Sequence, residues 1–414
     1  MSDSQQTTPE PKNVLLEGTA TLSPGAYVKN YLRRMRSGDM GSLPIILGLI
    51  VIAIIFQSQN EHFLTPRNFV NLIVQMAGIT TIAIGLVFVL LLGEIDLSVG
   101  YVSAVAAVFL AMRLRPPAGW PWYAGVIGAL LFAAAIGIVQ GLFITKARLP
   151  SFIVTLAGLL VWNGVVLLLI GTGGTVIIQD PVIIGIANYF LPPLWGWLVG
   201  IVAIVFFALG KLRRWKKRQN RSVSSEPIAI VILQIIMVTV VMAAVVYVAN
   251  QDRGVPFVGV LLLIFLVAFT FLADRTRFGR YVYAIGGNAE SARRAGIPVD
   301  RIKTLVFMIS SLMAGMGGIV LASRLRSVDT AAGGGNLLLM AIAAPVIGGT
   351  SLFGGYGRVI SALLGALIIS SIENGMGLLG LSAGAKFIIT GLVLLAAVLV
   401  DAITRRGREQ SGLG

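Results

Sequence analysis

Residues 70–92 read VNLIVQMAGITTIAIGLVFVLLL and contain no charged side chain. An α-helix of about 20 apolar residues crosses a hydrocarbon core about 30 Å thick, so this stretch is long enough to span a membrane. Similar stretches recur through the 414-residue chain, which is 57% hydrophobic and only 12% charged. A soluble chain of this length needs far more charge to cover its surface. The composition therefore predicts an all-α polytopic membrane protein.

The apolar stretches predict about 10–12 transmembrane helices in one domain over residues 42–403. Two stretches are short, and we expect tilted, broken or re-entrant elements there, with protein or water covering the backbone. These two are 97–112 and 337–350. The full set of predicted spans is 42–58, 70–92, 97–112, 121–144, 151–171, 188–210, 227–248, 257–273, 304–322, 337–350, 358–379 and 387–402.

Lys and Arg residues gather on one side of these predicted spans. With the N-terminus inside, 25 of the 32 Lys and Arg residues fall in cytosolic segments, so the positive-inside rule predicts that both termini are cytosolic.

No apolar stretch lies near Met1, so we expect no signal peptide and polar cytosolic tails over 1–41 and 404–414. The net charge of +15 follows from this topology, and we expect no nucleic-acid partner. The basic run over 211–221 is interpreted as a solvated loop beside anionic lipid headgroups.

The side-chain inventory excludes several kinds of chemistry. The chain has no cysteine and a single histidine, His62. Disulfides, thiolate nucleophiles and histidine-based metal sites or triads are therefore excluded. We expect no metal site, no cofactor held by this chain and no enzymatic activity.

Carboxylates inside the predicted spans need an explanation, because a charge at the bilayer centre costs at least about 2.5 kcal/mol. Glu94 and Asp96 lie where one predicted span ends and the next begins, and we predict a structural turn in which Asp96 caps the 97–112 helix rather than a proton relay. Glu373 lies deep in its predicted span beside Asn374. It is suited equally to hydrogen bonding with a polar solute and to pairing with another helix.

Segment 274–303 is the longest cytosolic loop with features of order. Asn288 is a suitable N-cap, residues 290–295 form a short helix, and Gly296 ends it. A helix of one or two turns is unstable alone, so we expect it to pack against a partner. The glycine-rich segment 348–357 lacks the Gly-Lys-Ser/Thr ending of a phosphate-binding loop, and it is interpreted as a tight link between two helices.

Four runs in the sequence resemble those of ABC-type monosaccharide importer permeases, in the same order and at similar spacing. They are EIDLSVG at 94–100, LPSFIVTLAG at 149–158, YAIGGN at 283–288 and VIGGTSLFGG at 346–355. The resemblance covers most of the chain after residue 42. An added hydrophobic pair around 188–248 and the motif at 252–256 are similar to the xylose-type branch. The long polar leader and Pro345 depart from the family pattern.

The resemblance implies a type II-like ABC importer permease bundle in the bacterial plasma (inner) membrane. It implies a homodimer that moves a monosaccharide by alternating access, D-xylose in the first place, with arabinose, ribose and galactose as alternatives. Expected partners are a second copy of the chain, a cytosolic ABC ATPase that binds ATP and Mg, a periplasmic sugar-binding protein and membrane lipid.

The resemblance also assigns roles to residues. Loop 274–303 corresponds to the ATPase-docking loop, and the expected coupling residues are Asn288, Ala289, Glu290, Ser291, Ala292, Arg293, Arg294, Ala295 and Gly296. Residues expected to be structural are Glu94, Asp96, Ser98, Gly100, Gly348, Gly349, Gly354 and Gly355. Polar residues within spans are candidates for the sugar path, although such groups also join helices to each other; they are Asn163, Ser310, Ser311, Asn336, Glu373 and Asn374.

Three other classes were weighed against this interpretation. An ion-coupled secondary sugar transporter would place a carboxylate near the midplane within inverted repeats, for which Glu373 is the one candidate and no repeat is visible. A membrane-embedded enzyme would need a catalytic pair of side chains within a span. A channel would not need a capped cytosolic helix.

Overall fold

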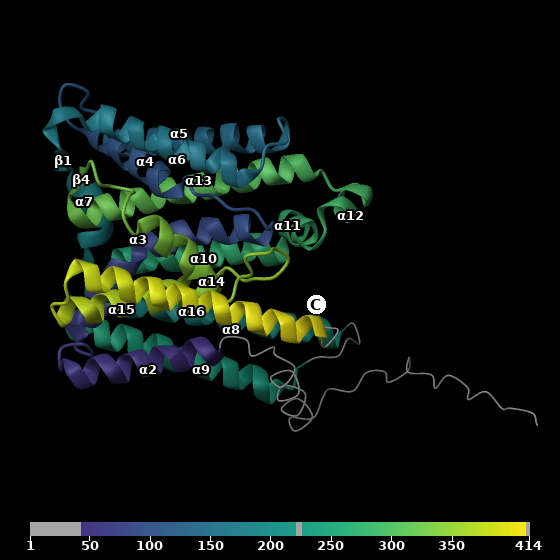
Figure 1. Cartoon of the computed structure of the whole chain (residues 1–414). Coiled ribbons are helices and arrows are strands. Elements are labelled where there is room, and N and C mark those ends of the chain that lie inside the picture. The colour runs from purple at the N-terminus through teal and green to yellow at the C-terminus, as the bar shows by residue number, and fades with distance from the viewer. Residues whose placement is uncertain (1–42, 221–225, 411–414) are drawn as a thin grey trace, which may run out of the picture. The chain divides into compact units, whose positions relative to one another are not determined.

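The computed structural model describes residues 43–220 and 226–410. The leader predicted over 1–41 lies outside these residues. Regular structure in the described part is almost entirely helical, with two small two-stranded antiparallel sheets (Figure 1). Eight of its helices are long and apolar enough to cross a membrane, and four shorter apolar helices accompany them. The all-α polytopic fold class predicted from the sequence is confirmed.

The helices and strands follow in chain order. The helices are α2 (Leu43–Gln59), α3 (Pro66–Leu91), α4 (Val99–Leu114), α5 (Trp122–Thr145), α6 (Ser151–Ile170), α7 (Pro181–Asn188), α8 (Pro193–Gln219), α9 (Ile228–Asn250), α10 (Phe257–Arg275), α11 (Arg277–Gly287), α12 (Ala289–Arg294), α13 (Val299–Leu325), α14 (Leu337–Ile347), α15 (Ile360–Leu378) and α16 (Ala383–Gln410). A 3-10 turn, η1 (Gly171–Gly173), follows α6. The strands are β1 (Thr175–Ile177), β2 (Phe190–Leu191), β3 (Val255–Pro256) and β4 (Ser327–Asp329); β1 pairs with β4 and β2 with β3.

The chain divides into two compact units. The described part of the smaller unit is 197–220 and 226–245, which holds most of α8 and α9. The larger unit, here called the main unit, contains the remaining described residues.

The structure corrects two expectations about the chain around α8. The predicted span began at 188, but α7 ends there, β2 follows, and α8 begins only at Pro193. Proline suits a first helical position because the backbone N–H that it lacks would have no partner within the helix there. Most of the basic run over 211–221, which was predicted as a loop, is helical instead, because α8 continues to Gln219. Lys211 lies 3.9 Å from Glu226, and Trp215 Nε1 donates to the Glu226 carbonyl at 3.1 Å.

Helix α13 forms the centre of the main unit and packs against α3, α4 and α5. Glycines on both sides bring the backbones close. A Cβ added at Gly318 would lie 2.0 Å from the carbonyl oxygen of Ser103 on α4. A Cβ added at Gly137 on α5 would lie 2.4 Å from the carbonyl oxygen of Phe307. Within lipid, close packing between small residues is a principal source of helix association. These glycines therefore allow α13 to be buried between its neighbouring helices.

The two short spans differ from each other in length. Helix α4 has 16 residues, about 24 Å at about 1.5 Å per residue, whereas α14 has 11 residues, about 16 Å. Helix α14 alone is too short to cross a core about 30 Å thick. It contains Pro345 and ends two residues later, as expected for a residue that cannot donate a backbone hydrogen bond.

Substitution of Gly318 tests whether this close packing holds the bundle together. Gly318→Ala should destabilise the protein by about 1–3 kcal/mol, because the added methyl group overlaps the α4 backbone. The matched control is Gly164→Ala on α6, where an added Cβ meets no atom within 4 Å. Thermal unfolding of the purified protein in detergent should show a lower Tm for Gly318→Ala only. Equal Tm values for the two variants would contradict the packing.

Candidate functional site

The segment between α10 and α13 contains two helices where the sequence predicted a loop with one. Helix α12 agrees with expectation: Asn288 Oδ1 accepts a hydrogen bond from the backbone N–H of Ser291 at 2.8 Å, and Gly296 follows the helix with φ +83°. Helix α11 was not predicted. Its N-cap is Thr276, whose hydroxyl accepts from the N–H of Gly279 at 3.1 Å.

The sequence did carry a signal for α11 that the loop interpretation overlooked. Phe278, Val282 and Ile285 have the spacing of one helical face, and the last two are buried. Thr276 stands immediately before that face at the N-cap position. Helix α11 is therefore an amphipathic helix that packs against the bundle.

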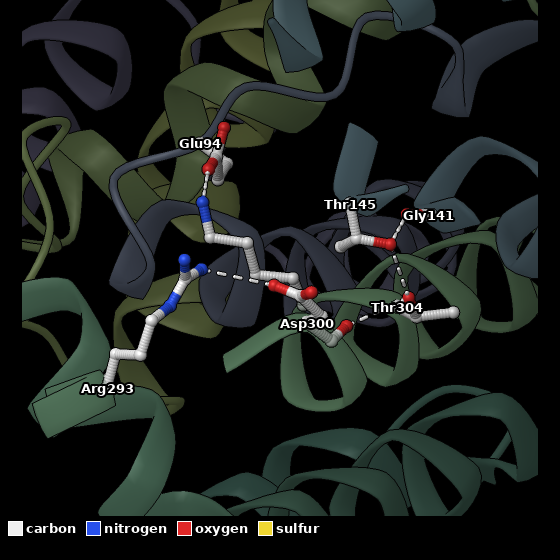
Figure 2. Close-up of polar contacts among 7 residues, drawn as sticks. Glu94, Gly141, Thr145, Arg293, Asp300 and Thr304 are labelled. Atoms are coloured by element: carbon white, nitrogen blue, oxygen red, sulfur yellow. Dashed lines mark hydrogen bonds and ion pairs between the residues drawn. The ribbon is translucent and has the colours of Figure 1, made fainter. Parts of the chain in front are cut away.

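Helix α12 and its flanks present a surface with a single buried residue. Of Asn288 to Gly296, only Ala292 is buried, and the other eight residues are exposed. Arg294 Nε donates to Glu290 Oε1 at 3.2 Å, one turn apart. Arg293 Nη2 donates to Asp300 Oδ1 of α13 at 3.2 Å, as Figure 2 shows. Helix α12 is thus exposed to a partner and joined to the start of α13.

Helix α11 lies against two other segments through backbone contacts. A Cβ added at Gly286 would lie 1.7 Å from the carbonyl oxygen of Leu91, which also accepts a hydrogen bond from the N–H of Gly355 at 2.9 Å. A Cβ added at Gly354 would lie 2.9 Å from both Gly286 O and Gly93 N. The end of α3, helix α11 and the glycine-rich link therefore meet at one point.

A side-chain bond reinforces this meeting point. The hydroxyl of Tyr283 donates to the carbonyl oxygen of Gly357 at 2.9 Å. Burial raises the pKa of Tyr283 above its usual value, so the hydroxyl keeps its proton and remains a donor at neutral pH. The same link carries Gly348 and Gly349, which directly follow α14. A Cβ added at Gly348 would lie 1.9 Å from Ser361 O at the start of α15.

The connection between α3 and α4 is joined to α13 at two points, here called the two-point latch. Lys303 Nζ pairs with Glu94 Oε1, and Ser310 Oγ donates to Asp96 Oδ2 at 3.0 Å (Figure 2 draws the first pair). Lys303 and Ser310 are seven residues apart, so they lie on the same side of α13 about two turns from each other. The latch therefore fixes this connection along about 10 Å of α13.

The carboxylate of Asp96 is not the N-cap that the sequence predicted. Ser98 occupies the cap position of α4, and Asp96 Oδ1 accepts from its backbone N–H at 3.0 Å and its hydroxyl at 2.6 Å. Asp96 is 1% exposed. Its third donor, Ser310, lies 214 residues away, so no local pattern could reveal it. Gly100 belongs to the same motif, and a Cβ there would lie 2.5 Å from Gly333 O.

Asp300 lies in the turn of α13 that contacts α5. Thr304 Oγ1 donates to the carbonyl oxygen of Asp300 at 2.9 Å and lies 3.4 Å from Thr145 Oγ1 (Figure 2). Thr145 Oγ1 in turn donates to Gly141 O at 2.8 Å. A displacement of α12 through Arg293 would therefore act on a turn of α13 that already touches α5 and the latch.

A polar cavity of about 410 Å³ lies at the other end of α13; we call it the polar recess. Four helix ends contribute to it: the start of α3, the end of α13, the end of α15 and the start of α16. The charge distribution predicts that this end faces outward. The recess is lined by Asn68, Asn71, Gln75, Arg324, Glu373, Asn374, Gly377, Leu378 and Lys386.

The six predicted path residues are separated by the structure. Glu373 and Asn374 line the polar recess, whereas Asn336 lines a smaller cavity of about 120 Å³ with apolar residues of α14, α15 and α16. The rest line neither cavity: Ser310 and Ser311 are fully buried on α13, and Asn163 is half-buried on α6. The Ser311 hydroxyl has no hydrogen-bond partner in the described residues.

The sequence pattern around Pro66 could have identified three recess residues that were not predicted. Asn68, Asn71 and Gln75 follow Pro66 at the spacing of one helical face, so a span beginning at 66 would have grouped them. Arg324 and Lys386 lie outside the predicted spans 304–322 and 387–402. They join the recess because α13 extends to Leu325 and α16 begins at Ala383.

The family profile described as branched-chain amino acid transport system / permease component matches residues 68–398, most of the chain. The chain belongs to this family. It is therefore a permease subunit of a transport system and not an enzyme.

The chain is also similar to individual proteins over nearly their whole length. The xylose transport system permease protein XylH of Escherichia coli K12 is 36% identical over 90% of this chain and 94% of its own length. XylH of Haemophilus influenzae is 33% identical over 88% of this chain and 98% of its own length. The ribose import permease protein RbsC of Escherichia coli K12 is 33% identical over 86% and 92%, respectively. No solved structure matches the chain significantly.

The burial of Asp96 gives a prediction about stability. Asp96→Ala should destabilise the protein by about 3 kcal/mol, because the hydroxyls of Ser98 and Ser310 lose their buried acceptor and a cavity forms. Asp96→Asn keeps an acceptor and the same shape, so it should cost less than about 1 kcal/mol. Thermal unfolding in detergent separates the two. A Tm for Asp96→Ala equal to that of Asp96→Asn would show that these bonds do not hold α13.

Proposed function

We propose that this chain is the permease subunit of an ATP-binding-cassette importer that moves a monosaccharide inward, D-xylose in the first place. The observation that carries the proposal is the exposed helix α12, joined by Arg293 to α13. The full-length relatives support a sugar, since the two kinds named are xylose and ribose permeases. The family description names branched-chain amino acids, whereas the full-length relatives are named as sugar permeases.

The proposed energy source is a separate ATPase on the cytosolic face. Residues 288–296 would enter a cleft on that subunit, and ATP and Mg would bind to the ATPase rather than to this chain. Closure of the ATPase would push α12 and, through Arg293 and Asp300, the first turn of α13. The two-point latch would carry this movement to the connection between α3 and α4. A helix end that moves as a rigid body in this way can switch a pathway between outward-open and inward-open states.

The proposed assembly follows from the same relationship. Two copies of this chain in the bacterial inner membrane would form the pathway, with an ATPase on each and a periplasmic sugar-binding protein outside. A second copy is expected because one chain offers only one coupling helix, whereas nucleotide-driven closure needs two ATPases. The exposed apolar faces of the main unit would contact the second copy or lipid.

The rival is a secondary transporter coupled to an ion gradient, with Glu373 as the ion-binding carboxylate. Sugar uptake into vesicles separates the two proposals. We expect uptake only when the vesicles contain the chain, its ATPase and its binding protein together with ATP. Uptake by the chain alone, abolished by an ionophore, would overturn the ABC importer and favour the rival.

The Arg293–Asp300 pair provides a sharper test of coupling. Its side chains are 59% and 47% exposed, so the pair contributes less than about 1 kcal/mol to stability, and its loss should leave insertion and Tm unchanged. Arg293→Glu places two carboxylates together and should lower sugar-stimulated ATP hydrolysis about tenfold, equivalent to about 1.4 kcal/mol. The double variant Arg293→Glu with Asp300→Arg restores an opposite-charge pair and should recover most of the activity. Normal hydrolysis by Arg293→Glu would refute this route.

A further inference from the structure

The polar recess is walled by side chains that are already fixed. Asn68 and Asn374 exchange hydrogen bonds at 2.7 and 3.0 Å, and both are 8% exposed. Asn374 Nδ2 also donates to Gln75 Oε1 at 3.2 Å. Asn71 Oδ1 accepts from Arg253 Nη2 at 2.6 Å. These bonds hold the amide groups in one orientation, as a preorganised binding site requires.

Other polar groups in the recess make no direct polar contact with the described residues. Across residues 43–220 and 226–410, the side chains of Arg324, Glu373 and Lys386 make no hydrogen bond and no ion pair within 4.0 Å. Arg324 and Lys386 are nevertheless close enough to Glu373 for their charges to interact. The Gln75 amide also keeps its Nε2 donor. A carboxylate flanked by two cations, none in direct contact, leaves room for a ligand between them.

We propose that the polar recess is a binding subsite for a neutral monosaccharide, whose hydroxyl groups bridge Glu373 to Arg324, Lys386 and Gln75. The inference rests on the proposed function and adds the place and the chemistry of substrate binding. A cavity of about 410 Å³ falls in the range of small-molecule sites, about 300–1,000 Å³. A pentose is well within that size.

The chemistry of the lining selects against one other ligand class. A sugar hydroxyl both donates and accepts, so it can bond a carboxylate and a cation at the same time. A branched-chain amino acid would need an apolar wall for its side chain, but Leu378 is the only large apolar residue of the lining. A neutral polyol can satisfy the carboxylate, the two cations and the amide together.

The position of the recess suits a subsite that communicates with the coupling helix. Arg324 is 21 residues after Lys303 on α13, about 31 Å along the helix. One rigid helix therefore has the recess at one end and the two-point latch with Asp300 at the other. Binding in the recess and movement of α12 act on the same element.

The absence of native cysteine allows a direct test by thiol labelling. Gly377→Cys places a unique thiol in the recess, where an added Cβ has only Lys386 Nζ nearby, at 3.9 Å. D-xylose at ten times its Kd should slow labelling by a water-soluble maleimide about tenfold, because about one site in eleven is then free. The control is Gln251→Cys, an exposed position outside the recess, whose labelling rate should not change.

Further variants identify the groups and the ligand class. Glu373→Leu in the Gly377→Cys background should remove the protection, whereas Glu373→Gln should retain part of it. L-leucine should give none. Protection by L-leucine equal to that by D-xylose, or protection that survives Glu373→Leu, would overturn the subsite.

The uptake assay separates failure of the subsite from failure of the proposed function. If the complete importer takes up D-xylose or another monosaccharide and no sugar protects Gly377→Cys, the recess is not a sugar subsite and the importer stands. If the complete importer takes up no monosaccharide and L-leucine protects Gly377→Cys, both proposals are wrong.

Discussion

The close approach of α13 to α3, α4 and α5 is the interaction on which the rest of the structure depends. Apolar helices gain little from meeting one another in lipid, because lipid tails are as apolar as the side chains. Association must come from close packing and polar contacts, and α13 has both. Gly318 and Gly137 mark positions where backbones touch, and Ser310 binds the buried carboxylate of Asp96. These contacts hold α13 against its neighbours, so we treat it as one element in the proposed movement.

This element connects the two ends of the main unit. Asp300 and Lys303 join α13 to the exposed helix α12 and to Glu94, while Arg324 reaches the polar recess about 31 Å away. The polar contacts of Asp300, Lys303 and Ser310 follow one another along α13. A push on α12 therefore acts on one helix, and that helix forms part of the recess wall. Family membership shows the transport role, and the proposed route for its control follows these contacts.

Local features of the chain were predictable from the sequence, and long-range ones were not. The 70–92 stretch, the cap at Asn288 and the stop at Gly296 depend on residues within a few positions of each other. The bond from Ser310 to Asp96 had no local signal, because the two residues lie 214 positions apart. The recess was found only in part because Asn68 and Asn374 meet across 306 residues. Helix α11 could have been predicted from the sequence. Its N-cap is Thr276, and its apolar face has helical spacing at Phe278, Val282 and Ile285.

We propose that α13 transmits movement of α12 to the polar recess. The most direct measurement is the labelling rate of Gly377→Cys in the complete importer, compared between the nucleotide-free state and a state trapped with ATP on a hydrolysis-deficient ATPase. We predict a clear change in rate between the two states, and no change when Arg293→Glu is present. Equal rates in both states without Arg293→Glu would show that the recess does not respond to the ATPase and would contradict the account.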